Sequence, residues 1–315
     1  MKVLLIGPQA PPFGGVSVFL KRHKRQLETE GHKVEVHDPT KLSAIYFFLA
    51  LFRLPFDEYD IISINVQSIY VLLILFALGL APRTEIVDHN WRLLETWPTY
   101  KIRLYSSIIN RCREIVLIGQ HLETYYRVHG VRLPAQTRVG HPFLAPPLEE
   151  EAAILDTYPN DVMTFVRQHH PLLIGNAPDI VFYRGTDLYG LDMTIELIAA
   201  LRQEFPAIGL LFVIGEIGNY DYYATVKRRI AELGIEENIS FMTGQRELWP
   251  LFRKADLMVR PTCSDAYGIS VAEALYLGCP AVASDVCERP AGALLFANRN
   301  SADFLLKCRA ALWRP

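Results

Sequence analysis

Two acidic residues eight positions apart, Asp265 and Glu273, are spaced so that they could do chemistry together. The apolar segment 256–259 predicts a short buried strand. A helix is expected over residues 269–277, because Gly278 follows it as a typical helix end. Asp265 then lies in the loop before the helix, and Glu273 lies within it.

The predicted start of this helix, around Gly268–Ser270, adds a second chemical feature. The backbone N–H groups and the dipole of a helix N-terminus attract anions, so this point suits a diphosphate. Two carboxylates beside it suit a nucleotide sugar, with one carboxylate on the sugar hydroxyls and the other on the ribose. The alternative is that Asp265 is an ordinary loop residue and Glu273 a solvated helix position.

The elements that must position these residues alternate between strand and helix. In the first half, apolar runs predict buried parallel strands at residues 2–6, 31–37, 59–65, 83–89 and 114–118. In the second half, the corresponding runs are residues 171–177, 208–214, 238–242, 256–259 and 281–283. We therefore expect an α/β protein with two Rossmann-like, doubly wound parallel-sheet domains, residues 1–168 and 169–315. Residues 125–151, rich in proline and ending in three glutamates, are expected to form a margin of the first domain and a linker.

The composition excludes several classes of function. A net charge of −2 gives no sign of a nucleic-acid partner, and none of the five cysteines has zinc-ligand spacing, which fits a reducing cytoplasm. Residues 1–7 predict a strand, because Pro8 and Pro11 interrupt any signal-peptide core. The longest apolar run, 69–80, is shorter than the roughly 20 residues that span a bilayer. We expect a cytoplasmic protein, either soluble or peripheral to the membrane.

The segment from Asp265 to Ser284 resembles a known signature. It reads Asp265-x7-Glu273-Ala-Leu and then Gly278-Cys-Pro-Ala-Val-Ala-Ser284, similar to the acidic-x7-acidic signature of the family 4 retaining glycosyltransferases, with Asp in place of the usual first Glu. The resemblance implies the GT-B fold, with two Rossmann-like domains facing across a cleft. It also implies a UDP- or GDP-linked sugar as donor, no metal and no other cofactor.

Several site residues follow from this resemblance. Asp265 is expected to act in catalysis on the sugar, together with His89, which follows a strand and is similar to a family histidine near the transferred sugar. Glu273 is expected on the ribose. Gly14 and Gly15, in a loop before a predicted helix, resemble the family loop that faces the donor. The alternatives are that His89 is a structural residue and that the loop has Gly14 and Gly15 only because it needs positive φ.

The phosphate site departs from the family. Typical members carry Gly-Arg and Lys-Gly where this chain has Gly175-Asn176 and Tyr189-Gly190. Arg184 is the first candidate for the missing positive charge and Arg260 the second, although Arg184 could be a surface loop residue. The donor-binding residues predicted in this half are Gly175, Asn176, Arg184, Tyr189, Gly215, Gly244, Tyr267, Gly268, Ile269, Ser270 and Glu273.

Two segments of the first domain suggest a membrane surface. Lys21–Arg25 is densely basic, and Leu42–Leu54 is strongly apolar and aromatic for a short helix. Together they could contact anionic lipid and the lipid part of an acceptor. The alternatives are a solvated helix face and a core helix.

The leading hypothesis is a retaining, metal-independent glycosyltransferase that uses a nucleotide diphosphate sugar and a glycan or lipid-linked acceptor in surface polysaccharide biosynthesis. No dedicated base stands out, so the leaving phosphate itself is expected to deprotonate the acceptor. A nucleotide-sugar epimerase of the same fold is one alternative. A non-catalytic partner of a membrane glycosyltransferase is the other.

Overall fold

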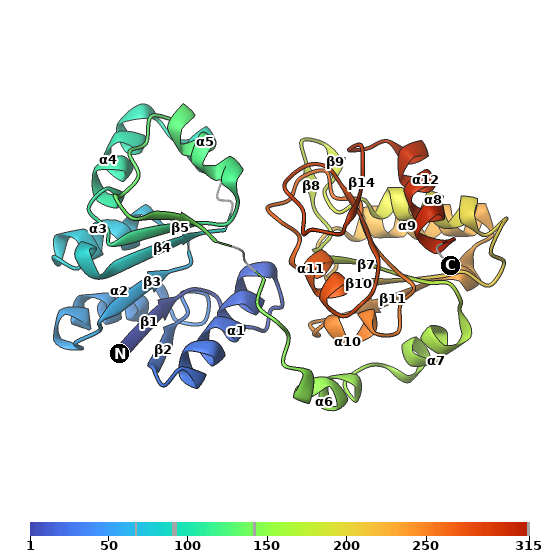
Figure 1. Cartoon of the computed structure of the whole chain (residues 1–315), viewed down its shortest axis with the longest axis horizontal. Coiled ribbons are helices and arrows are strands. Elements are labelled where there is room, and N and C mark those ends of the chain that lie inside the picture. Colours follow the sequence, from blue (N-terminus) through green and yellow to red (C-terminus); the bar gives the residue numbers. More distant parts are fainter. Residues whose placement is uncertain (67, 90–92, 141–142, 314–315) are drawn as a thin grey trace. The chain divides into compact units, whose positions relative to one another are not determined.

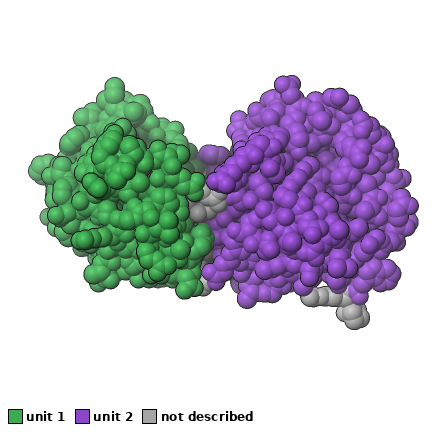
Figure 2. All heavy atoms as spheres, turned by 90° about the horizontal axis from the view of Figure 1, so that it is seen from above, with its two compact units in different colours: residues 1–10, 14–144 green, residues 11–13, 145–315 purple. Residues whose placement is uncertain are grey.

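The chain forms two compact units in a computed structural model that describes residues 1–66, 68–89, 93–140 and 143–313. Unit 1 comprises Met1–Ala10 and Gly14–Leu144, and unit 2 comprises Pro11–Phe13 and Ala145–Pro315. Figure 1 labels the elements of each unit, and Figure 2 colours the units separately.

Unit 1 is built on a sheet of six described strands, all paired in parallel, in the order β2-β1-β3-β4-β5-β6. The strands are β1 (Lys2–Ile6), β2 (Lys33–His37), β3 (Ile61–Ile64), β4 (Thr84–Asp88), β5 (Glu114–Leu117) and β6 (Thr137–Val139). The last of these lies in the segment 125–151 that was expected to be a margin and linker. The strand itself was not predicted, and the short run Thr137–Val139 pairs with β5 as the edge strand of the sheet.

The helices of unit 1 pack on different faces of its sheet. They are α1 (Gly15–Thr29), α2 (Ala44–Arg53), α3 (Ile69–Ala77), α4 (Thr99–Ile109) and α5 (Gln120–Val128), with short 3₁₀ turns η1 (Leu54–Phe56), η2 (Ala81–Arg83) and η3 (Leu93–Glu95). Leu5 of β1 packs with Leu20 of α1, whereas Leu4 beside it packs in the core that holds Phe47 of α2. Because neighbouring residues of a strand point to opposite faces, α1 and α2 cover opposite faces.

Unit 2 has a second parallel sheet, in the order β11-β10-β7-β12-β13-β14. Its strands are β7 (Leu172–Asp179), β10 (Gly209–Glu216), β11 (Ile239–Thr243), β12 (Leu257–Arg260), β13 (Ala281–Ser284) and β14 (Leu294–Phe296). A small antiparallel hairpin, β8 (Phe182–Tyr183) with β9 (Thr186–Asp187), follows β7.

Helices cover both faces of this second sheet. They are α6 (Glu151–Leu155), α7 (Asn160–Gln168), α8 (Leu191–Leu201), α9 (Tyr220–Leu233), α10 (Trp249–Phe252), α11 (Ile269–Tyr276) and α12 (Ser301–Leu312), with η4 (Leu148–Glu150) and η5 (Glu236–Asn238). Leu173 of β7 packs in the core with α8, α9 and α12, and Ile174 packs in the core with α7, α10 and α11. The prediction of two Rossmann-like parallel sheets is confirmed.

The units divide at a different place from the sequence-based domain boundary. They separate between Leu144 and Ala145, whereas the sequence suggested residues 168 and 169. The reason lies in α7 and the turn before it. Tyr158, Val162 and Val166 are buried in the core of unit 2, so this segment packs as part of that unit despite its linker-like composition.

Candidate functional site

The chemical groups of unit 2 gather where its central parallel strands end. Arg260 is the last residue of β12 and Ser284 the last residue of β13. These two strands and β7 are hydrogen-bonded neighbours, so their carboxyl ends lie along one edge of the sheet. In open α/β sheets, ligands bind outside this edge.

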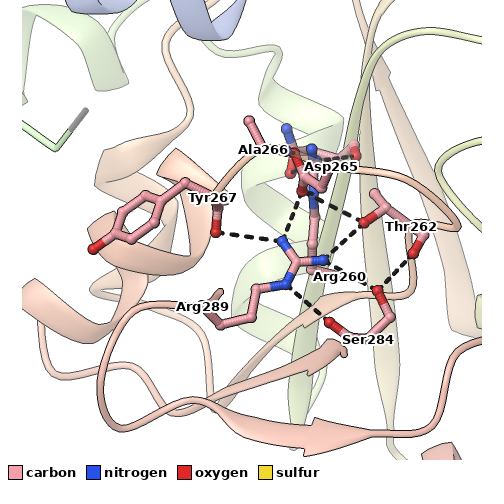
Figure 3. A network of polar contacts seen from close by, with 8 residues as sticks. Arg260, Thr262, Asp265, Ala266, Tyr267, Ser284 and Arg289 are labelled. Atoms are coloured by element: carbon pink, nitrogen blue, oxygen red, sulfur yellow. Dashed lines mark hydrogen bonds and ion pairs between the residues drawn. The ribbon is translucent and has the colours of Figure 1, made fainter. Parts of the chain in front are cut away.

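At this edge a single carboxylate pairs with two guanidinium groups (Figure 3). Arg260 Nε donates to Asp265 Oδ2 at 3.1 Å, and Arg289 Nη1 donates to the same oxygen at 2.8 Å. Thr262 Oγ1 lies 3.4 Å from Oδ2, and the Ala266 N–H donates to Oδ1 at 3.0 Å. The Asp265 side chain is 14% exposed. We call Arg260, Asp265 and Arg289 the arginine–aspartate cluster.

Arg289 is fixed from several directions, and its side chain is 1% exposed. Its guanidinium donates to the carbonyl oxygen of Ser284 at 2.9 Å, to Thr262 Oγ1 at 3.0 Å and to Ser284 Oγ at 3.1 Å. Arg289 was not predicted from the sequence. Its position shortly after a predicted strand could have indicated it. Loops that follow neighbouring parallel strands meet at one edge of the sheet, and this strand neighbours β12.

The cluster holds the Asp265 carboxylate charged. Burial alone would raise the pKa of Asp265, but the charges of Arg260 and Arg289 outweigh burial and hold this pKa well below its usual range. For Arg260, burial would lower the pKa, but the charge and the hydrogen bond of Asp265, together with Tyr189 and Cys287, outweigh burial and raise the pKa, so the guanidinium stays protonated. Two positive groups share one negative group, so the cluster carries a net positive charge.

Arg260 contacts both positions at which the family usually has a cation. Its Nη1 donates to the backbone oxygen and to Oδ1 of Asn176, each at 3.2 Å. Its guanidinium also lies over the Tyr189 ring, 5.1 Å from the centroid. Burial raises the pKa of the Tyr189 hydroxyl, so this ring stays neutral. The structure thus brings the predicted residues Asn176 and Tyr189 together around Arg260.

The start of α11 lies directly beside the cluster. Gly268 caps this helix with φ of +89°, and a Cβ built there would lie 2.7 Å from Arg289 Nη1. Arg289 Nη1 also lies 3.4 Å from the carbonyl oxygen of Tyr267. The first N–H groups of the helix, at Ile269 and Ser270, have no intrahelical acceptor, and no side chain caps them. Only glycine allows this close approach of the helix start to the guanidinium.

Glu273, the second acidic residue of the signature, is buried within α11 and only 5% exposed. Burial raises the pKa of the nearby Tyr158 hydroxyl, and the charges of Glu247 and Glu273 raise it further. The Tyr158 hydroxyl donates to the Glu247 carbonyl oxygen at 2.6 Å. Glu273 is therefore not a solvated helix position, which excludes that alternative.

Arg184 does not join the cluster. It lies with Gly185 at the turn of the β8–β9 hairpin, with φ of +51°, and is exposed. Its guanidinium lies 5.2 Å from the centroid of the neighbouring Tyr183 ring. The structure gives Arg184 the surface-loop position that was its alternative.

The other predicted glycines lie within β7 (Gly175), near the end of β10 (Gly215) and directly after β11 (Gly244), and each has a local structural reason. A Cβ on Gly175 would lie 2.7 Å from the Phe212 ring of the adjacent strand, and one on Gly215 would lie 2.6 Å from the Pro178 carbonyl oxygen. Gly244 has φ of +99°. These packing constraints account for the glycines without a ligand.

In unit 1, the Gly14–Gly15 pair begins α1. Gly14 is the N-cap of the helix with φ of −126°, and neither glycine is among the described positive-φ residues. No atom would lie within 4 Å of a Cβ on Gly14. Backbone conformation therefore does not require glycine here, which removes positive φ as the alternative explanation.

His89 follows β4 and is enclosed by aromatic and polar neighbours. Its Nε2 lies 2.9 Å from Asn65 Oδ1, and its ring meets the Phe19 ring edge-on at 5.1 Å. Burial and, to a lesser extent, the nearby His23 lower the pKa of His89 to about 3. His89 is thus a neutral imidazole that donates from Nε2 and keeps a lone pair on Nδ1.

The two segments predicted to meet a membrane differ in structure. In the basic segment Lys21–Arg25, Arg22 is buried and donates to the Leu144 carbonyl oxygen at 2.8 Å, and Lys24 pairs with Glu28. On α2, by contrast, Ile45, Tyr46, Leu49 and Phe52 are all more than half exposed. Because α1 and α2 cover opposite faces of the sheet, the two segments do not form one surface.

A surface hollow of about 330 Å³ lies elsewhere in unit 2, next to α8 and α9. Its lining includes Asp192, Tyr222, Arg229 and Arg299, and none of the predicted site residues. Within the described ranges, no group of three His, Cys, Asp or Glu side chains is placed to hold a metal ion. No helix among the described residues has the length and apolar character needed to cross a membrane.

Comparison with solved structures defines the class of fold. The crystal structure of Anabaena Alr3699/HepE in complex with UDP and glucose matches 99% of this chain and 90% of its own, with a TM-score of 0.68 and 19% sequence identity. The chain has the two parallel-sheet Rossmann-like domains of the GT-B fold, as the sequence predicted.

Sequence comparison then shows what the C-terminal segment is similar to. Residues 168–293 match the family model of the glycosyl transferases group 1. The lipopolysaccharide glucosyltransferase WaaG of Escherichia coli strain K12 is 32% identical over 98 residues, 31% of this chain and 25% of WaaG. The D-inositol 3-phosphate glycosyltransferase of Jonesia denitrificans is 26% identical over 129 residues, 38% of this chain and 30% of that protein. The matches span less than a third of these relatives, and they confirm the predicted resemblance to glycosyltransferases.

Proposed function

We propose that this chain is a retaining glycosyltransferase that moves a hexose from a nucleotide diphosphate sugar to a glycan or lipid-linked acceptor in surface polysaccharide biosynthesis. The observation that carries the proposal is the arginine–aspartate cluster, buried at the strand ends beside the start of α11. The family match over residues 168–293 supports it, as do the UDP and glucose in the HepE structure and the lipopolysaccharide in the name of WaaG.

In this proposal unit 2 binds the donor. The diphosphate lies against the net positive charge of the cluster and the free N–H groups at Ile269 and Ser270. Fixed positive charge of this kind stabilises a departing nucleotide diphosphate without a divalent ion. Buried Glu273 would bind the ribose hydroxyls. The leaving phosphate would take the proton of the acceptor hydroxyl.

Within unit 1, His89 and the Gly14–Gly15 loop would have ligand-binding roles of their own. His89 is neutral, so its free Nδ1 can accept a hydrogen bond from a hydroxyl group of the sugar or acceptor. The space around Gly14 would let the backbone approach the ligand. Neither role requires a charge on unit 1.

The exposed apolar face of α2 supports an acceptor with a lipid part. Single exposed apolar residues are common, but Ile45, Tyr46, Leu49 and Phe52 gather on one short helix. We propose that this face touches the membrane or the lipid of the acceptor, with the protein at the inner face of the cell membrane. The basic segment Lys21–Arg25 has no part in this contact.

Calorimetric titration of the full chain with UDP and with GDP, with and without magnesium, tests the donor site. We expect one of the two to bind at micromolar concentration, independently of magnesium, and binding to be lost in Glu273→Ala. Absence of binding by both nucleotides would contradict the proposal. It would favour the alternative of a non-catalytic partner. The observation that supports this alternative is that Asn176 and Tyr189 are neutral where cations were expected.

A further inference from the structure

We infer that Arg260 supplies the positive charge that meets the donor diphosphate, and that Asp265 is its counter-ion, a positioning residue and not a ligand of the sugar hydroxyls. The inference rests on the proposed function, since it names the groups that would act within the same donor site. It reverses the sequence-based ranking of Arg184 and Arg260 and changes the role expected of Asp265.

The position of Arg260 suits a phosphate ligand. The two places where the family has cations are occupied here by Asn176 and Tyr189, and Arg260 touches both, through hydrogen bonds of 3.2 Å and a ring contact of 5.1 Å. One guanidinium from β12 therefore occupies the space between the positions of two missing cations. The Asn176 amide and the Tyr189 ring are neutral, so on the side that faces them the positive charge of Arg260 is not compensated.

Arg260 also keeps hydrogen-bond donors that its neighbours do not use. Its Nε is used by Asp265 and its Nη1 by Asn176, while Nη2 has no hydrogen-bond acceptor among the described residues. The residue is only 8% exposed. Arg260 Nη2 is not one of the described buried polar atoms without a partner, so it is open to a ligand, and a phosphate oxygen is its best charge-assisted acceptor.

The Asp265 carboxylate is already occupied by partners within the chain. A carboxylate offers about four acceptor positions. Oδ2 already meets Arg260, Arg289 and Thr262, and Oδ1 accepts the Ala266 N–H. Oδ2 is therefore fully used by partners within the chain, which leaves a sugar hydroxyl no position on this oxygen. The shorter side chain of Asp, compared with the usual Glu, keeps the carboxylate among the arginines.

The test compares binding of the nucleoside diphosphate with binding of the uncharged nucleoside, UDP with uridine or GDP with guanosine, by calorimetry. Arg260→Gln should weaken diphosphate binding by about tenfold or more and leave nucleoside binding within about twofold, because the charge-assisted contact with the phosphate is lost and an uncharged nucleoside makes no such contact. Arg260→Lys, which keeps the charge, should recover part of the loss. Arg184→Gln is the matched control and should bind both ligands like the wild type.

Asp265→Asn separates the two roles of the carboxylate. As a counter-ion, Asp265 positions Arg260, so this variant should also weaken UDP or GDP binding by about tenfold while nucleoside binding persists. As a sugar ligand it would leave the binding of UDP or GDP unchanged, and that result would overturn the inference. Retained nucleoside binding and an unaltered circular dichroism spectrum report that the variant is folded.

The outcomes for the two proposals differ. If the wild type binds neither UDP nor GDP, the proposed function itself fails. If the wild type binds one of them and Arg260→Gln binds it equally well, only the inference fails. If Arg184→Gln loses diphosphate binding and Arg260→Gln does not, the hairpin arginine is the phosphate ligand and the inference is wrong.

Discussion

The His89 imidazole is held neutral by its surroundings, and this state can be measured. The amide of Asn65 is oriented by Ser63, so its oxygen faces His89 Nε2 and fixes the proton there. With a folded-state pKa of about 3 against about 6.5 when unfolded, the folded protein binds fewer protons between these values. The contribution of neutral His89 to the free energy of unfolding is therefore complete above about pH 6.5, and it decreases as the pH is lowered below this value.

We predict that one histidine signal in carbon-13 NMR spectra stays in the neutral form at pH 5, and that this signal disappears in His89→Gln. We also expect the variant to lose part of the acid destabilisation, up to about 1.4 kcal/mol per pH unit. A His89 signal that titrates near pH 6.5 would contradict the buried, neutral imidazole.

Gly268 is required for two separable reasons, its φ of +89° and the 2.7 Å approach of a Cβ to Arg289 Nη1. Gly278 provides the matched control, because it has φ of +84° and nothing within 4 Å of a Cβ. We predict that Gly278→Ala lowers the free energy of unfolding by about 1–2 kcal/mol through backbone strain alone. Gly268→Ala should lower the free energy of unfolding by more than this, as measured by urea unfolding. Equal losses would show that the approach to Arg289 is unimportant.

The signature Asp265-x7-Glu273 could be read from the sequence, and so could its position on a loop and the following helix. The partners of Asp265 could not. Arg289 lies 24 residues further along the chain and reaches the carboxylate only because β13 lies beside β12 in the sheet. Arg184 was preferred because it is close in sequence to the missing cations, but a hairpin turn carries it to the surface.

At the scale of elements, strands were easier to predict than the faces that helices cover. Short apolar runs between glycine and proline specify buried parallel strands, and β1, β10 and β12 were found as expected. The dense charge of Lys21–Arg25 and the apolar run of α2 seemed to form one membrane surface. Their separation onto opposite faces depends on the order β2-β1-β3, which local composition does not specify.

The exposed face of α2 gives a prediction at this scale. Replacing Leu49 and Phe52 together by Gln should change the free energy of unfolding by less than about 0.5 kcal/mol per site, because both are more than half exposed. The same variant should lose flotation with vesicles of phosphatidylethanolamine and phosphatidylglycerol.

Two variants control this experiment. Lys21→Gln with Arg25→Gln, on the opposite face, should float like the wild type. Leu51→Ala, at a side chain with no exposure, should cost about 2–5 kcal/mol of stability. Flotation that depends on the basic pair and not on α2 would contradict the proposed contact.

At the scale of the whole molecule, the division into units gives a prediction about truncation. A fragment of residues 145–315 retains α6, α7 and Tyr158, whereas a fragment of residues 169–315 removes side chains that lie in the core of unit 2. We predict that the longer fragment unfolds cooperatively in urea. The shorter one should be destabilised by several kcal/mol, as the loss of buried Tyr158, Val162 and Val166 implies. Equal stability would place the boundary at residue 168 after all.

The central claim is that a nucleotide diphosphate binds at the carboxyl ends of β7 and β12 and at the start of α11. Backbone amide NMR spectra of the full chain, recorded with and without whichever of UDP or GDP binds, test it most directly. We predict that the largest shift changes fall on Asn176, Gly268, Ile269 and Ser270. Changes confined to the hollow beside α8 and α9, at residues such as Asp192, Tyr222 and Arg229, would contradict the account and place the ligand there.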